Sequence, residues 1–310
     1  MKLYRSLSEI PARLSPSAIS VGNFDGVHRG HLKLINRLLK IEASGGGTPS
    51  VLSFDPHPQQ VLRGVSPPAL TTTEAKISLL KQAGVKRAFI LPFDEEFSKL
   101  EPEDFASTIL GERLNSRAVV VGANFRFGRF ARGDVTMLRD LGKRAGYKVE
   151  GAPLVRVGGR TVSSTEIRHA IEAGELKWAN RALGRAYRVG GTVVTGAKRG
   201  HQLGFPTANL SPDANVCLPS EGVYAGRAVS GRDSYKAAIS VGINPTFGDG
   251  KLSIEAFILD FKGDLYGKWL DLDFVARIRG QVRFESAQLL ASAMSQDIKA
   301  ANNLLDRSSL

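Results

Sequence analysis

Two histidines three residues apart, His28 and His31, stand where an apolar run at residues 18–21 gives way to a helical pattern. The turn that follows the apolar run, GNFDG at residues 22–26, is rich in glycine. A strand, a glycine turn and a helix start in this order point backbone N–H groups at an anion, and glycine lets the anion come close. The spacing puts both imidazoles on one face of the first turn, where they can hold charge on a phosphate under attack. The alternative is a histidine pair that caps or solvates an ordinary helix start.

A second anion site is predicted at residues 162–168, VSSTEIR. Ser163 followed by Glu166 fits a capping box, which places a helix start there. The hydroxyls and N–H groups of that helix start would face an anion, with Arg168 on the first turns. The same pattern is common as a purely structural cap, and the residues alone leave that alternative open.

Two further groups of polar and aromatic residues follow predicted strands. His57 lies between prolines in FDPHP, residues 54–58, where it is either part of a rigid turn or a site residue. Asn124, Phe125 and Phe127 lie in GANFRFG, residues 122–128. The phenylalanines can stack on a flat ring and the amide can bond its polar edge, unless both rings belong to the core. Because ligands of parallel sheets lie beyond the carboxyl ends of the strands, the sequence predicts one shared cleft.

The later part of the chain holds a loop, GFPTAN at residues 204–209, and one carboxylate within an apolar β-run. Thr207 and Asn209 offer neutral oxygens of the kind that Mg²⁺ binds, although by chemistry alone the loop is equally well a turn. Glu255 alternates with Ile254 and Ala256. If these two pack inward, Glu255 faces the other side, which can simply be solvent.

The elements that must position these residues change in kind near residue 184. Before it, apolar runs alternate with helical patterns, which favours an α/β fold with a parallel sheet and helices on both faces. After it, strand-like alternation and glycine turns, followed by a helix at about residues 286–305, favour a small β-barrel. We therefore predict domains 1–184 and 185–310. The predicted strands are 18–21, 50–54, 87–92, 118–122, 187–195, 222–229, 235–241, 252–261 and 268–274, and the predicted helices include 73–84 and 102–113.

Composition narrows the classes of function. The single cysteine, Cys217, excludes a disulfide framework and a cysteine zinc site. No apolar run approaches 18 residues and no signal peptide is evident, so we expect a cytoplasmic protein without a membrane partner. The net charge of +12 suits nucleotides and nucleic acid equally, but the basic residues are spread along the chain. A P-loop motif is absent from the sequence.

The block GNFDGVHRGH at residues 22–31 resembles the G-x-F-D-x-x-H-x-G-H signature of the cytidylyltransferase-like nucleotidyltransferases and matches it at every fixed position. With VSSTEIR, FDPHP, GANFRFG and GFPTAN, the chain is similar to the bacterial two-domain riboflavin kinase/FAD synthetases over about residues 15–305. The resemblance implies a Rossmann-like nucleotidyltransferase domain that makes FAD from FMN and ATP. It also implies an antiparallel barrel with a C-terminal helix that makes FMN from riboflavin and ATP.

The resemblance implies roles for residues of the first domain. His28, His31 and Arg168 would be catalytic, and an FMN phosphate oxygen would attack the α-phosphorus of ATP as pyrophosphate leaves. The residues implied to bind ATP and its phosphates are Gly22, Asn23, Phe24, Asp25, Gly30, Ser164 and Thr165. The residues implied to bind flavin are His57, Pro58, Asn124, Phe125 and Phe127.

In the second domain the resemblance implies that Glu255 is the general base on the riboflavin 5′-hydroxyl. Thr207 and Asn209 would be the magnesium ligands that hold Mg-ATP. Two departures from the family pattern, His201 in place of arginine and Gln281 in place of glutamate, touch loops that would cover the kinase substrates, so they bear on affinity. The residues implied to bind ATP here are Gly196, Lys198, Gly204, Phe205, Pro206, Thr207 and Asn209.

Two alternatives stay open at this point. One is that the chain retains only one of the two activities. The other is a nucleic-acid-binding relict of a nucleotidyltransferase, which predicts surface aromatics and a basic stripe on the barrel. We expect ATP, riboflavin and FMN as small-molecule partners, Mg²⁺ with ATP as cofactor, flavins as substrates and products, and no nucleic acid. The sequence leaves the oligomeric state open.

Overall fold

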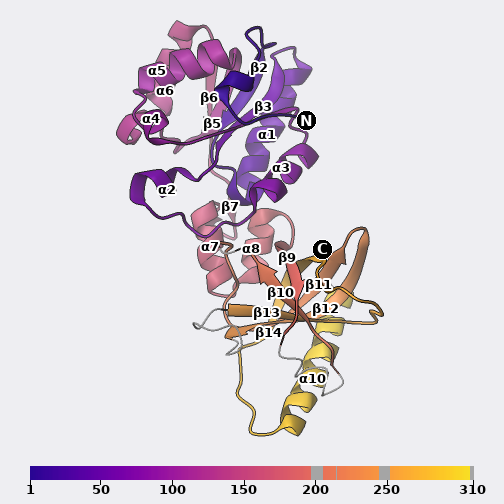
Figure 1. Cartoon of the computed structure of the whole chain (residues 1–310). Helices are drawn as coiled ribbons and strands as arrows, with labels where there is room; N and C mark the ends of the chain where they lie inside the picture. The colour runs from indigo at the N-terminus through magenta and orange to yellow at the C-terminus, as the bar shows by residue number, and fades with distance from the viewer. Residues whose placement is uncertain (197–204, 214, 244–251, 308–310) are drawn as a thin grey trace. The chain divides into compact units, whose positions relative to one another are not determined.

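The computed structural model describes residues 1–196, 205–213, 215–243 and 252–307. The chain divides into two compact units, Met1–Ser164 and Thr165–Leu310, and each is described by itself (Figure 1). Within the described residues no helix is both long enough and apolar enough to cross a membrane.

The first unit is built on a six-stranded sheet in which all neighbours are parallel, which confirms the predicted α/β fold. The strand order is β1-β4-β3-β2-β5-β6, so the order reverses between β2 and β5. Ligands of such sheets bind at the carboxyl ends of the strands beside a reversal of this kind. The strands are β1 (Lys2–Tyr4), β2 (Ser17–Val21), β3 (Thr48–Phe54), β4 (Arg87–Leu91), β5 (Ser116–Gly122) and β6 (Lys148–Ala152), with a separate hairpin of β7 (Arg156–Val157) and β8 (Arg160–Thr161).

Helices cover both faces of this sheet. Since neighbouring strand residues point to opposite faces, each face has its own buried cluster. Ala18 of β2 belongs to a buried cluster with Leu38 of α1, whereas Ile19 belongs to a cluster with Leu110 and Leu138 from the other face. The α-helices of the first unit are α1 (Arg29–Ala43), α2 (Pro58–Arg63), α3 (Thr73–Gln82), α4 (Glu95–Ser98), α5 (Pro102–Asp104) and α6 (Val135–Ala145). Its other helical segments are η1 (Leu7–Glu9), η2 (Asp25–Val27), η3 (Phe105–Arg113) and η4 (Arg129–Ala131).

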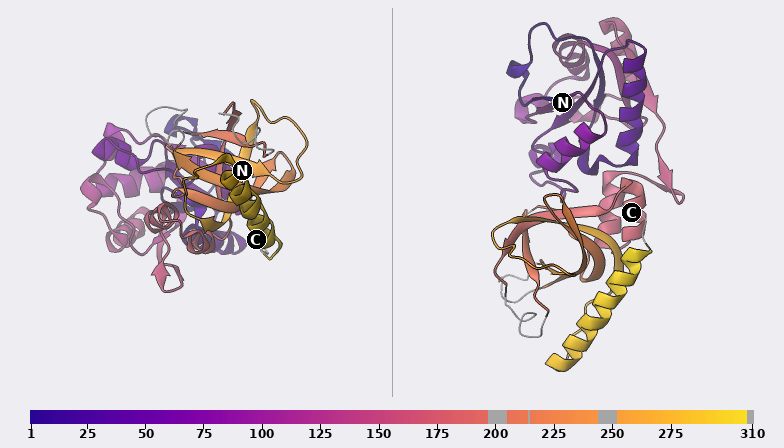
Figure 2. Two further views of the ribbon diagram at one scale, coloured as in Figure 1. Left: turned by 90° about the horizontal axis from the view of Figure 1, so that it is seen from below. Right: turned by 90° about the vertical axis from the view of Figure 1, so that its right-hand side faces the viewer.

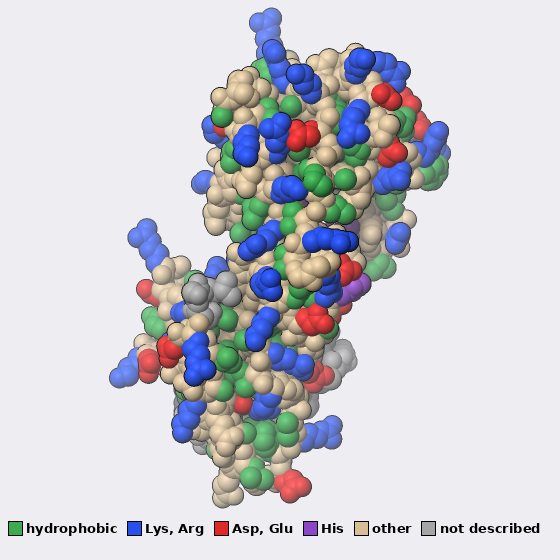
Figure 3. All heavy atoms as spheres, turned by 180° about the vertical axis from the view of Figure 1, so that it is seen from behind, with side chains coloured by type: hydrophobic (Ala, Val, Ile, Leu, Met, Phe, Trp, Pro, Cys, Tyr) green, Lys and Arg blue, Asp and Glu red, His purple; other side chains and the backbone are tan. Residues whose placement is uncertain are grey.

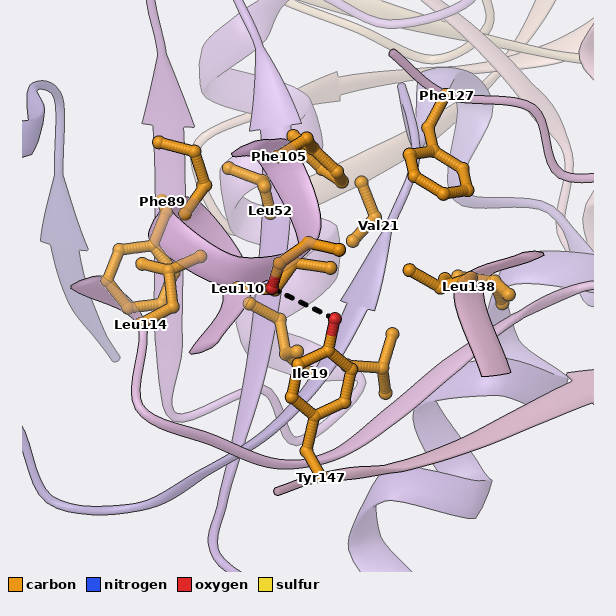
Figure 4. Packing of buried hydrophobic residues seen from close by; sticks show 14 of the residues in the cluster. Ile19, Val21, Leu52, Phe89, Phe105, Leu110, Leu114, Phe127, Leu138 and Tyr147 are labelled. Atoms are coloured by element: carbon orange, nitrogen blue, oxygen red, sulfur yellow. Dashed lines mark hydrogen bonds between the residues drawn. The ribbon is translucent and has the colours of Figure 1, made fainter. Parts of the chain in front are cut away.

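The predicted helix at residues 102–113 is present, but most of it is a π-helix, η3. At its end the Leu114 N–H donates to the carbonyl of Ile109, five residues back, at 3.0 Å. The hydroxyl of the buried Tyr147 donates to the Ala106 carbonyl of η3 at 3.0 Å, within the core shown in Figure 4. Burial raises the pKa of Tyr147 to about 12, so the hydroxyl stays a donor.

The second unit is a closed barrel with the strand order β10-β13-β12-β11-β14-β9, and all six pairs are antiparallel, which confirms the predicted barrel. Period-two alternation fills its interior: along β9, Tyr187, Val189 and Val193 are buried while Arg188 is exposed. The strands are β9 (Tyr187–Val194), β10 (Ala208–Pro212), β11 (Gly222–Ser230), β12 (Asp233–Ile243), β13 (Leu252–Ile258) and β14 (Trp269–Arg279).

The predicted C-terminal helix is α10 (Ala287–Asp306), which lies along the outside of the barrel (right-hand view of Figure 2). Its buried residues Ala301 and Leu305 pack with Ala225, Ala238 and Val275 of the strands. The Ser286 hydroxyl caps the helix by accepting from the Leu289 N–H at 3.3 Å. A small barrel thus gains an apolar flank, which adds to the core that its own strands can bury.

Helices α7 (Ser164–Glu172) and α8 (Leu176–Leu183) lie before the domain boundary that we predicted at residue 184. The compact units divide earlier, after Ser164, so α8 belongs with the barrel. The buried Asn180 of α8 accounts for this. Its amide nitrogen donates to the Phe274 carbonyl at 2.9 Å, and its amide oxygen accepts from the Tyr187 N–H at 2.8 Å.

Candidate functional site

The loop after β2 has its shape fixed by Phe24 and Asp25. Phe24 has φ 51° and is fully buried, a left-handed conformation that a bulky residue keeps only where its surroundings hold it. The Asp25 carboxylate accepts from the N–H groups of Leu70 and Thr71 at 3.0–3.1 Å, and from the Thr71 hydroxyl at 3.2 Å. Asp25 therefore fastens this loop to the segment before α3.

His28 and His31 lie with their rings stacked, with centroids 3.7 Å apart and planes 12° apart. His28 caps α1, because its Nδ1 accepts from the His31 backbone N–H at 3.3 Å. This bond fixes the orientation of the His28 ring at the start of the helix. Gly30 makes room for that ring, since a Cβ at this position would lie 2.9 Å from His28 Cε1.

The Nδ1 of His31 is buried and has no hydrogen-bond partner in the part of the chain that the structure describes. Burial, with the charges of His28 and Lys76 adding to it, holds the pKa of His31 well below its ordinary value of 6.5. A neutral imidazole with an unmet ring nitrogen is suited to a ligand that completes its hydrogen bonding. The first turn of α1 thus offers two imidazoles and its N-terminal dipole to an anion.

Lys76 of α3 belongs to this site and was missed by the sequence analysis. It is buried, and its Nζ lies 3.4 Å from both the Asn23 carbonyl oxygen and Ser53 Oγ. Burial lowers the pKa of Lys76, and the charges of Asp25 and Asp55 oppose that shift. A lysine on a helix gives no sequence signal of burial. Only the packing of α3 against η2 brings its ammonium to the loop after β2.

The loop after β3 meets the loop after β2. The side-chain nitrogen of Asn23 and His57 Nε2 are 2.9 Å apart. His57 also caps α2, because its Nδ1 accepts from the Gln59 N–H at 3.2 Å. His57 is therefore part of a rigid helix start and also a direct neighbour of a residue predicted to bind ATP.

The second predicted anion site starts at Ser164, the first residue of α7, where the capping box predicted a helix start. The Ser164 hydroxyl donates to the Asp25 carbonyl at 2.9 Å, so this segment contacts the loop that leads to His28. Thr165 and Arg168 follow along α7 in the second unit, and Arg168 is buried.

A cavity of about 620 Å³ lies in the first unit and is lined by residues from the loops after β2, β3, β4 and β5. This volume lies in the range of small-molecule sites. Of the predicted residues, those that line it are Gly22, Asn23, Pro58, Asn124, Phe125 and Phe127. Aromatic residues that the sequence analysis missed line it as well: Phe54, Phe93, Phe97, Phe105 and Phe130.

Phe125 and Phe127 stack on one another, with ring centroids 5.7 Å apart and planes 10° apart. Phe127 is buried in the core of the sheet, and the half-buried Phe125 packs against that core. Both rings also line the cavity, so the two alternatives posed for them do not exclude one another. Asn124 is exposed and places a side-chain amide at the same cavity.

In the second unit Glu255 belongs to a polar cluster on the barrel. Ile254 and Ala256 are fully buried, so Glu255 lies on the other side of β13, where it is partly buried. The Thr207 hydroxyl donates to Glu255 Oε2 at 3.3 Å, and Asn209 stands opposite Glu255 in the β10–β13 register. Asn209 Oδ1 is buried and has no hydrogen-bond partner among the residues described.

One glycine, Gly196, and one glutamine, Gln281, lie beside this cluster. A Cβ at Gly196 would overlap the Asn209 side chain, so only glycine fits there without movement. The Gln281 amide donates to Ser240 Oγ and to the Val241 carbonyl, both at 3.0 Å, and Ser240 stands opposite Glu255 in the β12–β13 register. Gln281 therefore ties the segment after β14 to the strand beside Glu255.

The rest of the predicted GFPTAN site is described only in part. Phe205 packs edge-to-face on Phe257, with centroids 5.8 Å apart, and Pro206 is exposed. Lys198, His201 and Gly204 lie outside the described residues.

Two family models match the chain. The model for FAD synthetase matches residues 10–166, and the model for riboflavin kinase matches residues 183–305. The two matches together span both the sheet unit, with its histidine pair and cavity, and the barrel.

The chain is similar along nearly its whole length to bifunctional riboflavin kinase/FMN adenylyltransferases. The protein of that name from Pseudomonas fluorescens is 34% identical over 305 residues, which is 98% of each chain. The one from Bacillus subtilis is 33% identical and covers 92% of this chain and 91% of its own, and the one from Escherichia coli K12 is 31% identical over 96% of each. A crystal structure described as a macrolide-efflux protein from Streptococcus pneumoniae has the same fold, with a TM-score of 0.88 at 29% identity over 97% of this chain and 98% of that one.

Proposed function

This chain belongs to the family of bifunctional riboflavin kinase/FMN adenylyltransferases, and we propose which of its residues carry out the two reactions. It is an enzyme with both domains. One phosphorylates riboflavin with ATP to give FMN, and the other transfers the adenylyl group of a second ATP to FMN, which gives FAD and pyrophosphate.

For adenylyl transfer we assign the histidine pair to the phosphates of ATP. An FMN phosphate oxygen forms a bond to the α-phosphorus, and the bond from that phosphorus to the bridging oxygen of the leaving pyrophosphate breaks. His28 and the unmet Nδ1 of His31 beside it would bind phosphate oxygens as their charge grows. Ser164 contacts the same loop, and Thr165 and Arg168 on α7 are proposed to hold the departing pyrophosphate. Asn23, held by Lys76 and His57, would keep the loop in place.

The observation that carries this assignment is the position of the cavity. It is lined by the loops after four strands, and Asn23 of its lining lies in the same loop that leads to His28. Phe125 and Phe127 supply apolar ring faces, and Asn124 supplies an amide, which together suit a flat ring with one polar edge. We therefore assign the cavity to the flavin of FMN, with its phosphate toward α1.

For the kinase reaction we assign Glu255 as the general base. It would accept the proton of the riboflavin 5′-hydroxyl as that oxygen bonds to the γ-phosphorus of ATP and ADP leaves. Glu255 is partly buried and accepts a hydrogen bond from the Thr207 hydroxyl at 3.3 Å, which helps to orient its carboxylate. Gly196, Phe205 and Pro206 would bind ATP with the loop residues Lys198 and Gly204.

Mg²⁺ is proposed to bind with ATP at Thr207 and Asn209. The fit rests on Asn209 Oδ1, a buried oxygen with no hydrogen-bond partner among the described residues, beside the hydroxyl of Thr207. Neutral oxygens and few protein ligands suit this ion, which keeps its waters and substrate phosphates. The bound ion would neutralise phosphate charge.

The remaining parts of the assignment concern partners and boundaries. Lys and Arg side chains are scattered among other types on the face in Figure 3. We propose ATP, riboflavin and FMN as the partners, without nucleic acid. We propose a cytoplasmic enzyme that acts without a membrane. For the domains, we propose 1–184 and 185–310 as the parts that carry the two reactions. An isolated barrel fragment would have to start at Thr165, because α8 packs on the barrel through Asn180.

The test separates the two sites in the full chain. His28→Ala is expected to lower FAD formation from supplied FMN by at least tenfold while riboflavin phosphorylation stays normal. Glu255→Gln is expected to lower riboflavin phosphorylation by about 10²–10⁴ while FAD formation from FMN stays normal. The measurement is chromatography of flavin products with Mg-ATP. Equal loss of both products in either variant would contradict the two-site assignment.

A further inference from the structure

Two large apolar side chains that line the cavity are exposed. Phe130 of η4 is 81% exposed and Leu62 of α2 is 61% exposed. A single exposed apolar side chain is ordinary on a protein surface. Two of them that line one concave site indicate a surface which a ligand covers.

The backbone at Phe130 is strained. Phe130 has φ 55° and ψ 22°, and the next residue, Ala131, also has φ 55°. Residues with a Cβ rarely adopt this left-handed region, and a bulky side chain there is an outlier. Such conformations persist where the surrounding structure imposes them, and they cluster at ligand sites.

Phe130 lies in the loop of residues 127–133, and contacts at the base of this loop hold its conformation. Two backbone hydrogen bonds between Phe127 and Gly133, at 3.0 and 3.1 Å, close its neck. The Arg129 N–H donates to the Leu100 carbonyl at 2.7 Å, and the guanidinium of Arg129 pairs with Glu101 at 3.4 Å. The same guanidinium lies 4.9 Å from the centre of the Phe130 ring. The loop is thus fastened along its base, while its tip holds an aromatic ring out at the cavity.

Resting on the assignment of this cavity to flavin, we propose that Phe130 and Leu62 position the flavin by packing on the side of its ring that faces solvent. Phe125 and Phe127 line the same cavity from its inner wall. A flat flavin ring that packs on them has its other face toward solvent, where Phe130 and Leu62 can cover it. An exposed phenylalanine that becomes buried on binding gains hydrophobic stabilisation and a ring contact. Both residues act on binding, and neither has a group that takes part in the chemistry.

The kinetic test uses the full chain and supplied FMN. Phe130→Ala and Leu62→Ala are expected to raise the KM for FMN in FAD formation by about tenfold, with kcat within twofold and the KM for ATP unchanged. Val65→Ala is the matched control, because Val65 is 70% exposed in the same unit and does not line the cavity. Variants at Phe130 and Leu62 that behave like Val65→Ala would overturn the proposal.

A spectroscopic test asks directly whether the ring at position 130 meets the flavin. An indole stacked on isoalloxazine quenches its fluorescence, so Phe130→Trp should quench bound FMN more than Val65→Trp does. FMN bound in the barrel contributes equally to both variants, so the difference reports the first unit. Equal quenching would overturn the proposal. If the unaltered chain makes FAD and these variants match their controls, only the role of Phe130 and Leu62 fails; if it makes no FAD from FMN, the proposed function fails.

Discussion

Replacement of Gly30 by alanine should separate the geometry of the histidine pair from the stability of the fold. An alanine Cβ would lie 2.9 Å from His28 Cε1 and 3.0 Å from its Nδ1. Ordinary contacts begin at 3.4 Å, so the imidazole must move by about 0.5 Å. The His28 ring is buried and already stacked on His31 at 3.7 Å, so it cannot move without disturbing its partner. Since a misplacement of about 1 Å can cost roughly 10²-fold in rate, we expect FAD formation to fall by about tenfold.

Stability should respond in a different way. Gly30 lies in the first turn of α1 without a positive φ, where alanine is favoured over glycine by up to about 1 kcal/mol. We therefore expect a free energy of unfolding within about 1 kcal/mol of the unaltered protein, and normal riboflavin phosphorylation. The assays are steady-state FAD formation from FMN and urea denaturation. Gly111→Ala is the control, because its Cβ would meet the nearest atoms at 3.5 and 3.6 Å in another helix of the same unit. Full FAD synthesis by a well-folded Gly30→Ala enzyme would refute the reasoning.

Three other outcomes follow from buried groups. Since the native pKa of His31 lies below 6.5, the unfolded chain binds the proton first as the pH drops. The free energy of unfolding should therefore fall as the pH drops through 6.5, by at most about 1.4 kcal/mol per pH unit. In urea titrations His31→Gln should reduce this dependence on pH, and an unchanged dependence would assign it to other groups. Gly196→Ala should displace the buried Asn209 and lower riboflavin phosphorylation by at least about tenfold while FAD formation from FMN persists; a normal kinase rate would show that Asn209 is dispensable. Arg87→Met should lower the free energy of unfolding of the first unit by about 1–3 kcal/mol, because the buried guanidinium donates to oxygens of Ser15, Ser17 and Thr48. A free energy of unfolding equal to that of the unaltered protein would mean that water replaces those hydrogen bonds.

Local patterns of apolar and turn residues predicted four of the six strands of the parallel sheet. Strands β2, β3, β4 and β5 were predicted within two residues at each end, because continuous apolar runs between turn signals mark strands buried on both faces. Strand β6 was missed, since KVEGA is an edge strand with exposed charges and a glycine. The π-helical turn of η3 was also missed, because hydrogen bonds five residues back leave no distinct signal in the order of apolar residues.

The sequence by itself determined the motifs and the elements on which they lie, because a turn, a helix start or an alternating strand depends on neighbours along the chain. Only the tertiary structure decided which of them meet. Asn23 contacts His57 across 34 residues, and Lys76 becomes buried against the Asn23 loop through the packing of a separate helix. Glu255 comes opposite Asn209 through strand register alone, and α8 packs on the barrel with several buried residues, Asn180 among them. Such contacts depend on how whole elements pack, and no stretch of neighbouring residues encodes them.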